Sequence, residues 1–430
     1  MRDVGRRGAG PPTPLHRSRR PPPPLPAMRI ALAAATDPRT DRRVRAHARA
    51  LGAAGHQVTL FGVAAPGTEP EEDDGPVVIV RVPLPAGNGA RAAASPWGAS
   101  PWARRHERVV QAAVARGHFD VLHACGVDIA RAALRARRPG GACLVLDDAG
   151  PGRLDLVARR TAELPVGARR AAAEVVVAYL RRGEDRAQRR ARATADLVVA
   201  ASPALATDGL ARWGGPPPVV VHDSFVAPPR RTGERLRARL GIHPDERVIV
   251  VREEGRGAES VARALRILGD RHVLVLAGWC GSPAAVLAAA EATDLAGRVR
   301  LLPPAPEAEL LEFCAGADVG VLLVPAPDRP GRLAAPRGFY ELLAAGTPVV
   351  APDTPGTGEL VRATGAGVLY PGRDPADPGA VAEALRTVLS DPSLAAACRE
   401  RALRARDDDL SWTRQAARLT AAYEMLAATV

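Results

Sequence analysis

One carboxylate, Glu341, lies in a pattern that places it near the rim of a parallel sheet. Pro336 suits a first helical turn, and Gly346 suits the stop of the same helix. The apolar run TPVVA over residues 347–351 follows, of the kind that is buried in a parallel sheet. Such folds bind ligands outside the ends of their strands. The sequence therefore predicts a ligand site that includes Glu341 and the glycine-rich turn after this strand.

Residues 332–361, RLAAPRGFYELLAAGTPVVAPDTPGTGELV, resemble the nucleotide-sugar-binding part of the GT-B glycosyltransferases, in the retaining group labelled glycosyl transferases group 1. The resemblance covers about residues 28–428 and is strongest over 298–428. It implies two Rossmann-like domains facing a central cleft, and a nucleoside-diphosphate sugar as donor substrate, with no cofactor and no bound metal. It also implies that Glu341 accepts hydrogen bonds from the donor ribose hydroxyls, since both carboxylate oxygens can accept. A solvent-facing helix glutamate is the alternative.

The segment VREEGRGAESVARAL resembles the family's strand, glycine-containing loop and helix. The resemblance implies that Arg256 holds the donor diphosphate, because a guanidinium fork binds phosphate oxygens well. Gly257 would let the loop approach the ligand closely. A solvated surface arginine is the alternative reading of Arg256.

Several positions depart from the family's pattern. The family often has a second glutamate eight residues before the first, where this chain has Leu333. A large subgroup reads Pro-Asn-Lys before the helix, where this chain reads Pro336, Arg337 and Gly338. We hypothesise that Arg337 supplies the missing positive charge, although its side chain leaves the helix about 100° away from the lysine position.

The N-terminal half also departs from the family, which commonly has Asp-x-His-Glu near the transferred sugar. Here Asp147 and Asp148 end a strand, and Ala149 takes the histidine position. Asp148 is a candidate to bind a sugar hydroxyl or act as a base, with a helix-capping aspartate as the alternative. His123, which matches a His-rich loop of the family, is a candidate for the cleft, with a satisfied half-buried histidine as the alternative.

The run DPRTDRRV over residues 37–44 resembles an N-terminal signature of a subset of the family. We expect it at the same rim of the sheet. Arg39 and Arg43 are candidates to reach the donor phosphate or an anionic acceptor, and Asp41 is a candidate helix cap.

Strand and helix patterns alternate from Met28 to the end of the chain, which predicts an α/β fold of doubly wound parallel sheets. We expect five parts: a disordered Pro/Arg-rich tail (1–27), an N-terminal acceptor domain (28–222), a linker (223–245), a nucleotide-sugar domain (246–409) and a final helix (410–430) that packs back on the N-terminal domain. Whether translation starts at Met1 or Met28 stays open. The predicted strands are 29–35, 57–62, 77–83, 119–125, 142–147, 197–201 and 218–222, then 247–252, 272–277, 298–302, 318–324, 347–351 and 366–370.

Composition limits the classes of partner. The net charge is +12, and every strong base is arginine because the chain has no lysine. Arginines crowd residues 153–193, which suggests peripheral membrane contact, although interleaved acids make a solvated helix face the alternative. An aromatic content of 3% argues against a base-stacking nucleic-acid surface.

The five cysteines are an odd number without metal-ligand spacing, and no apolar run reaches the roughly 18–20 residues that span a membrane. We therefore expect a cytoplasmic protein, which could also associate peripherally with the inner face of the membrane.

The resemblance implies a retaining, metal-independent glycosyltransferase that moves a sugar to an unidentified glycan, glycolipid or small natural product. The lost motif positions motivate a second hypothesis, a catalytically silent partner protein of the same fold. A third is a sugar-nucleotide epimerase or hydrolase. Turnover of sugar nucleotides with and without acceptor separates the three.

Overall fold

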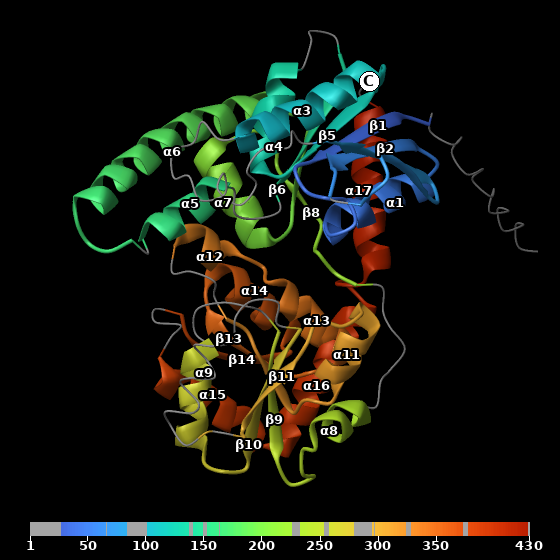
Figure 1. Cartoon of the computed structure of the whole chain (residues 1–430). Coiled ribbons are helices and arrows are strands. Elements are labelled where there is room, and N and C mark those ends of the chain that lie inside the picture. The colour runs from blue at the N-terminus through green and yellow to red at the C-terminus, as the bar shows by residue number, and fades with distance from the viewer. Residues whose placement is uncertain are drawn as a thin grey trace, which may run out of the picture.

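The computed structural model describes residues 27–428 except 66, 84–100, 137–140, 149–152, 163, 226–232, 253–257, 279–294, 296, 324–327 and 373–376. Its strands form two separate sheets, one from each half of the chain. Figure 1 shows one sheet above the other, with three helices of the second half turned toward the first half. These helices are α12 (Arg329–Leu333), α13 (Arg337–Ala345) and α14 (Pro355–Thr364).

The first sheet has eight strands in the order β3-β4-β2-β1-β5-β6-β7-β8, and only the β3–β4 pair is antiparallel among the described strands. Its central strands are apolar on both faces, so helices must cover both. The strands are β1 (Arg29–Ala34), β2 (Gln57–Val63), β3 (Glu71–Asp74), β4 (Val77–Val82), β5 (Val121–Cys125), β6 (Cys143–Asp148), β7 (Leu197–Ala200) and β8 (Val219–Val220). The helices of this half are α1 (Arg42–Ala53), α3 (Pro101–Arg116), α4 (Val127–Ala136), α5 (Arg153–Ala162), α6 (Ala168–Thr194) and α7 (Pro203–Trp213).

The second sheet has six parallel strands in the order β11-β10-β9-β12-β13-β14. The chain starts in the middle, moves outward on one side and then crosses to the other, which is the Rossmann order. Its topological switch point lies between β9 and β12, where such sheets bind ligands. The strands are β9 (Arg247–Val251), β10 (His272–Ala277), β11 (Val299–Leu302), β12 (Val319–Val321), β13 (Val349–Asp353) and β14 (Gly367–Pro371). The other helices of this half are α8 (Glu234–Leu240), α9 (Ala258–Leu268), α11 (Glu307–Ala315), α15 (Pro378–Leu389) and α16 (Pro392–Asp407).

The last helix, α17 (Trp412–Ala427), returns to the first sheet. Ser411 caps it by accepting a hydrogen bond from the Arg414 amide at 3.4 Å. Leu419 and Tyr423 are fully buried in the same apolar cluster as Ile30 of β1. In Figure 1 the helix runs beside α1 and β1. The first sheet is therefore completed by the end of the chain.

The doubly wound parallel sheets predicted from the sequence are confirmed, but several elements were not predicted. The strand β3 has the sequence EEDD, which has low β-propensity. It pairs with the edge strand β4, and Asp74 lies between the guanidinium groups of Arg45 and Arg49, which hold the pKa of Asp74 well below its usual value. The helices α7, α8 and α12 were also missed, and α8 lies inside the predicted linker 223–245. Residues 1–26 of the predicted tail lie outside the described residues, and the five domain boundaries stay a prediction.

Candidate functional site

Glu341 lies inside α13, one turn after Pro336, which is the N-cap residue of this helix. Gly346 ends the helix in the left-handed conformation with a φ of 71°, as the sequence predicted. The Glu341 side chain is only 4% exposed, so it does not face solvent. One carboxylate oxygen lies 2.8 Å from Arg252, and the other lies 3.0 Å from Arg337. Both carboxylate oxygens therefore already bind guanidinium groups. The predicted hydrogen bonds of Glu341 with the ribose hydroxyls of the donor stay a prediction.

Arg252 is a site residue that was not predicted from the sequence. It follows the last residue of β9, at the switch point of the second sheet, and its side chain is 8% exposed. It also donates to the carbonyl of Ala277, and its Nε has no hydrogen-bond partner among the described residues. Gly278 has a φ of +70°, and a Cβ there would lie 2.5 Å from the Arg252 guanidinium. Glycine at this position therefore leaves room for the buried arginine.

The other predicted donor residues are distributed around this pair. Gly338 is buried in the first turn of α13, and Arg337 is 47% exposed beside it. Arg337 pairs with Glu341 within the helix, so the hypothesis that it replaces the lost lysine charge stays open. Arg256 and Gly257 lie outside the described residues.

An ion-pair chain crosses from this helix to the first half of the molecule. The Glu307 carboxylate, at the start of α11, lies 2.5 Å from Arg42 of α1 and 3.8 Å from Arg337. The Arg42 guanidinium lies 3.5 Å from the centroid of the Phe225 ring. Burial lowers the pKa of Arg42 even though the Glu307 charge acts in the opposite direction. Arg39 and Arg43 of this run were predicted from the sequence as ligand contacts, and Arg42 was missed.

Arg43 is buried and does not face the cleft. It donates two hydrogen bonds to the Asp147 carboxylate, at 2.9 and 2.7 Å, and one to the Val221 carbonyl at 2.7 Å. Burial by itself would raise the pKa of Asp147, but the Arg43 guanidinium holds it at about 2. Arg39 is 50% exposed and lies 3.6 Å from Glu72 of β3. Both arginines are paired with carboxylates of the protein. Their predicted contacts with the donor phosphate or an anionic acceptor stay predictions.

His123 is fully buried against α17. Its Nδ1 lies 2.7 Å from the Tyr423 hydroxyl, its Nε2 has no partner among the described residues, and burial lowers its pKa to about 4. His47 and Asp147 lie beside it, and one ligand atom from each of the three lies within 4.8 Å of the others. No metal site was predicted from the sequence, and this cluster was missed because its members come from α1, β5 and β6. Arg43 already binds both oxygens of Asp147, and its charge opposes a second cation there.

Asp148 is buried on the opposite face of β6. Its carboxylate lies 2.9 Å from Arg192 of α6, which is 2% exposed. Burial raises the pKa of Asp148 to about 6, and the Arg192 charge limits this rise. The pair favours a structural contact between β6 and α6, and the predicted role as a base remains untested. Ala149 lies outside the described residues.

Leu333, which takes the place of the family's other glutamate, packs on the first half of the molecule. It contacts an apolar cluster that includes Ala201 and Leu205 at the start of α7. An ion pair between Arg329 and Asp208 lies in the same contact between α12 and α7. This position is therefore used for contact between the two halves.

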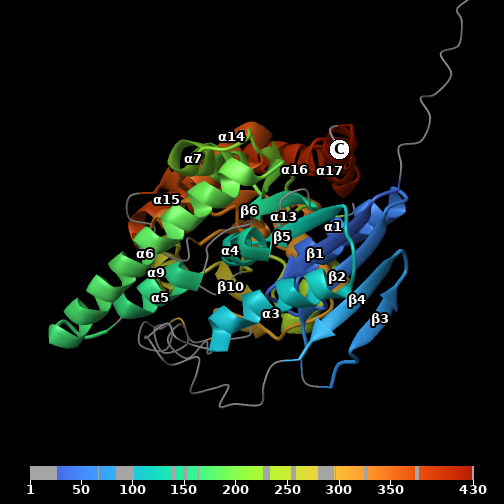
Figure 2. The ribbon, with the colours of Figure 1, turned by 90° about the horizontal axis from the view of Figure 1, so that it is seen from above.

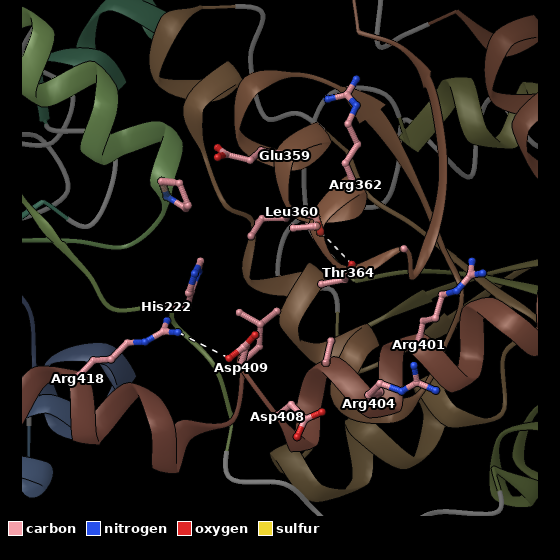
Figure 3. Close-up of a pocket in the computed structure, with 15 residues that line it drawn as sticks. His222, Glu359, Leu360, Arg362, Thr364, Arg401, Arg404, Asp408, Asp409 and Arg418 are labelled. Carbon is pink, nitrogen blue, oxygen red and sulfur yellow. Dashed lines mark hydrogen bonds and ion pairs between the residues drawn. The ribbon is translucent and has the colours of Figure 1, made fainter.

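A separate cavity of about 650 Å³ lies between α14, α16 and α17. Figure 3 shows Arg418 directed toward Asp409 on one side, with Arg401 and Arg404 on the other. None of the residues selected from the sequence line it. The C-terminal ends of α14 and α16 meet there, and their carbonyls attract the cations that line it. The arrangement explains the arginines without a ligand, so we place the candidate site at Glu341.

Two Rossmann-like units with a site at the switch point of the second unit define the GT-B class of glycosyltransferases. Residues 234–405 match the model of the Glycosyl transferases group 1 family, and residues 40–223 match that of Glycosyltransferase Family 4. These matches confirm the resemblance to the glycosyltransferase family over the two ranges, the chain has the GT-B fold, and the retaining stereochemistry stays a prediction.

Curated relatives carry inositol phosphate in their names. The chain is 33% identical over 253 residues to D-inositol 3-phosphate glycosyltransferase 1 of Catenulispora acidiphila, which covers 54% of this chain and 57% of that protein. It is 35% identical over 222 residues to the D-inositol 3-phosphate glycosyltransferase of Geodermatophilus obscurus, with 48% and 46% covered. The chain spans about half the length of the curated relatives it matches.

Solved structures share the fold along nearly the whole chain. Sucrose-phosphate synthase from Thermosynechococcus elongatus is 20% identical with a TM-score of 0.72, and the alignment covers 93% of this chain and 99% of that one. Anabaena HepE in complex with UDP-glucose is 17% identical with a TM-score of 0.65, and 93% and 100% are covered. Among the described residues, no helix is both long and apolar enough to cross a bilayer.

Proposed function

We propose that the protein transfers a sugar from a nucleoside-diphosphate sugar to an acceptor hydroxyl, with retention at the anomeric carbon and without a metal. The observation that carries the proposal is the contact of the buried Glu341 carboxylate with Arg252 and Arg337 at the switch point of the second sheet. UDP is our first choice of nucleotide, because HepE, a protein of the same fold, is described in complex with UDP-glucose.

The arrangement suits a diphosphate leaving group. Two guanidinium groups meet one carboxylate, so one positive charge is left to stabilise the negative charge that develops on the leaving diphosphate. The first turn of α13 lies beside them and adds backbone N–H groups of the kind that bind phosphate. Each Glu341 oxygen can accept a further hydrogen bond, which leaves it able to bind the ribose hydroxyls.

The resemblance implies that the leaving phosphate helps to remove the acceptor proton on the same face of the sugar, so no protein nucleophile is required. This fits a site in which Asp148 and His123 are buried in contacts with α6 and α17. On this account the protein residues bind and orient the donor and stabilise charge, and the phosphate takes the proton.

We further propose a phosphorylated polyol as the acceptor. The names of the curated relatives, which contain D-inositol 3-phosphate, support this class. A cell-envelope glycan, a glycolipid and a small natural product are the other acceptors to test. Among the described cysteines, Cys125, Cys314 and Cys398 are free thiols, which supports a reducing compartment such as the cytoplasm.

Calorimetric titration of the full chain with UDP, GDP, ADP and dTDP sugars tests the donor proposal. We expect one nucleotide class to bind, and Glu341→Gln to weaken it at least tenfold, because a buried hydrogen-bonding anion is lost (about 1.5–3 kcal/mol). Thermal unfolding of the variant must show that it is folded, since the change also leaves Arg252 without its counter-ion. Failure of every donor to bind to folded wild-type protein would reject the enzyme proposal.

A silent partner protein is the second candidate, and the packing of Leu333 against the first half favours it. Donor binding without turnover, in the presence of inositol phosphates and lipid acceptors, would support this candidate over the transferase. Turnover of the donor by water alone would instead support a hydrolase.

Peripheral membrane contact through residues 153–193 is a further part of the proposal. Val175 and Tyr179 on α6 are 70% and 72% exposed, and Arg182 and Arg186 follow at intervals that keep them on the same helix face. Figure 2 shows α5 and α6 projecting beyond the first sheet, away from α17. We expect the double variant Arg182→Glu/Arg186→Glu to lose cosedimentation with anionic vesicles. Binding that is unchanged by the variant would reject this surface.

A further inference from the structure

Glu307 lies between two arginines that come from different halves of the molecule. Its carboxylate is 2.5 Å from Arg42 of α1 and 3.8 Å from Arg337 of α13. The three side chains are 46%, 25% and 47% exposed, respectively, so solutes can reach them. Arg337 also pairs with Glu341, which places this contact next to the proposed donor site.

The two arginines are held in position by the same aromatic ring. The Phe225 centroid lies 3.5 Å from the Arg42 guanidinium carbon and 5.9 Å from that of Arg337. Stacking on a ring fixes the plane of a guanidinium group and leaves its in-plane N–H groups available to an anion. The two like charges near one ring repel each other, and an anion between them reduces this repulsion.

We infer that Arg42 and Arg337 form a phosphate-binding clamp across the two halves, and that Glu307 fills it in this structure. A phosphate group carries up to two charges and three accepting oxygens, so it bridges two guanidinium forks better than a single carboxylate does. The inference rests on the proposed function for the identity of the ligand. The phosphate belongs either to the donor diphosphate or to a phosphorylated acceptor.

In this clamp, the Glu307 carboxylate competes with the phosphate for Arg42 and Arg337. When a phosphate enters, the carboxylate must leave both arginines and return to solvent, which its exposure allows. Binding would then replace an ion pair between the halves with a ligand held by both halves. If Glu307 only formed a structural ion pair between the halves, its removal would loosen this contact and would not tighten phosphate binding.

The test is calorimetry on the full chain with three probes: UDP, inorganic phosphate and D-inositol 3-phosphate. We expect Glu307→Gln to tighten phosphate binding about 3- to 10-fold, since it removes the competing charge and keeps the side-chain size. We expect Arg42→Gln to weaken the same binding at least about tenfold. Glu309→Gln is the matched control, because Glu309 is in the same first turn of α11 and makes no contact with Arg42 among the described residues.

Each outcome decides a separate point. Tightening for UDP alone assigns the clamp to the donor diphosphate, and tightening for D-inositol 3-phosphate and inorganic phosphate alone assigns it to the acceptor. No tightening for any probe, with a folded Glu307→Gln variant, overturns the clamp, as does unchanged binding in Arg42→Gln. Failure of wild-type protein to bind any nucleotide rejects the proposed function separately, and the two phosphate probes then still decide the clamp.

Discussion

Both halves of the molecule bury a carboxylate against arginine near strand ends, but the two clusters differ in access to solvent. In the first half, Asp147 and Arg43 are 1% and 7% exposed. In the second half, Glu341 is 4% exposed, but its partner Arg337 is 47% exposed. The same pairing chemistry therefore gives one sealed cluster and one cluster that a ligand can reach.

The difference has a topological cause. The last helix, α17, returns to the first sheet and places Tyr423 over His123 and Trp412 beside His47. The Glu341 cluster instead lies at the start of α13, where the ion-pair chain to Arg42 leads out to solvent-exposed Glu307. A sealed pair can only contribute to stability, whereas an accessible one can exchange its partner for a ligand.

Removing an arginine from the sealed cluster should have the largest effect. We expect Arg43→Gln to lower the free energy of unfolding by about 3–5 kcal/mol, because it leaves Asp147 buried without its partner. Equilibrium urea unfolding measures the loss. Arg39→Gln is the control, and we expect it to change stability by less than about 0.5 kcal/mol, because its ion pair is exposed. Similar losses in both variants would mean that the first cluster is not sealed.

The sealed cluster should also make stability depend on pH. Burial lowers the pKa of His123 to about 4, and likewise that of His222, so the unfolded chain takes up protons first as pH falls below about 6.5. The stabilisation is complete above about pH 6.5 and is lost as pH falls toward about 4, at up to about 1.4 kcal/mol per pH unit for each histidine. Asp148 acts in the opposite direction, because its raised pKa of about 6 lets the folded chain bind its proton first.

Burial also lowers the pKa of His47, in the same cluster, well below its usual value, so these three histidines outweigh Asp148 and we expect a net loss of stability on acidification. Urea unfolding at about pH 7 and about pH 4.5 should show it, and His123→Gln should make the dependence shallower. His243→Gln is the matched control, since that side chain is exposed. A pH dependence that is the same in wild type and His123→Gln would show that His123 is not buried neutral in solution.

Much of the fold could be predicted because it depends on local patterns. An alternating pattern of strands and helices predicted the strand at residues 272–277, as observed for β10, and Gly346 was predicted as the stop of α13. Strand β3 was missed because its acidic residues form a strand only through pairing with β4. Local sequence does not carry that kind of information.

The site was harder to predict, because access depends on distant segments. Arg42 and Arg43 are adjacent in α1, yet one faces Glu307 and the other Asp147, since successive helix residues point about 100° apart. His123 is sealed by Tyr423, which is 300 residues away in the sequence. Arg43 and His123 were predicted as site residues from their type and position, and no local signal marked them as buried.

Removing an arginine from the accessible cluster should change stability much less than removing Arg43. We expect Arg337→Gln to lower the free energy of unfolding by no more than about 1 kcal/mol, because the lost pair is half exposed and Arg252 still balances Glu341. Donor binding should nevertheless weaken about tenfold, since a charge-assisted contact to phosphate is lost. Urea unfolding and nucleotide calorimetry on the same variant give the two numbers. A stability loss as large as that of Arg43→Gln, with donor binding unchanged, would mean that both clusters are structural and that the ligand binds elsewhere.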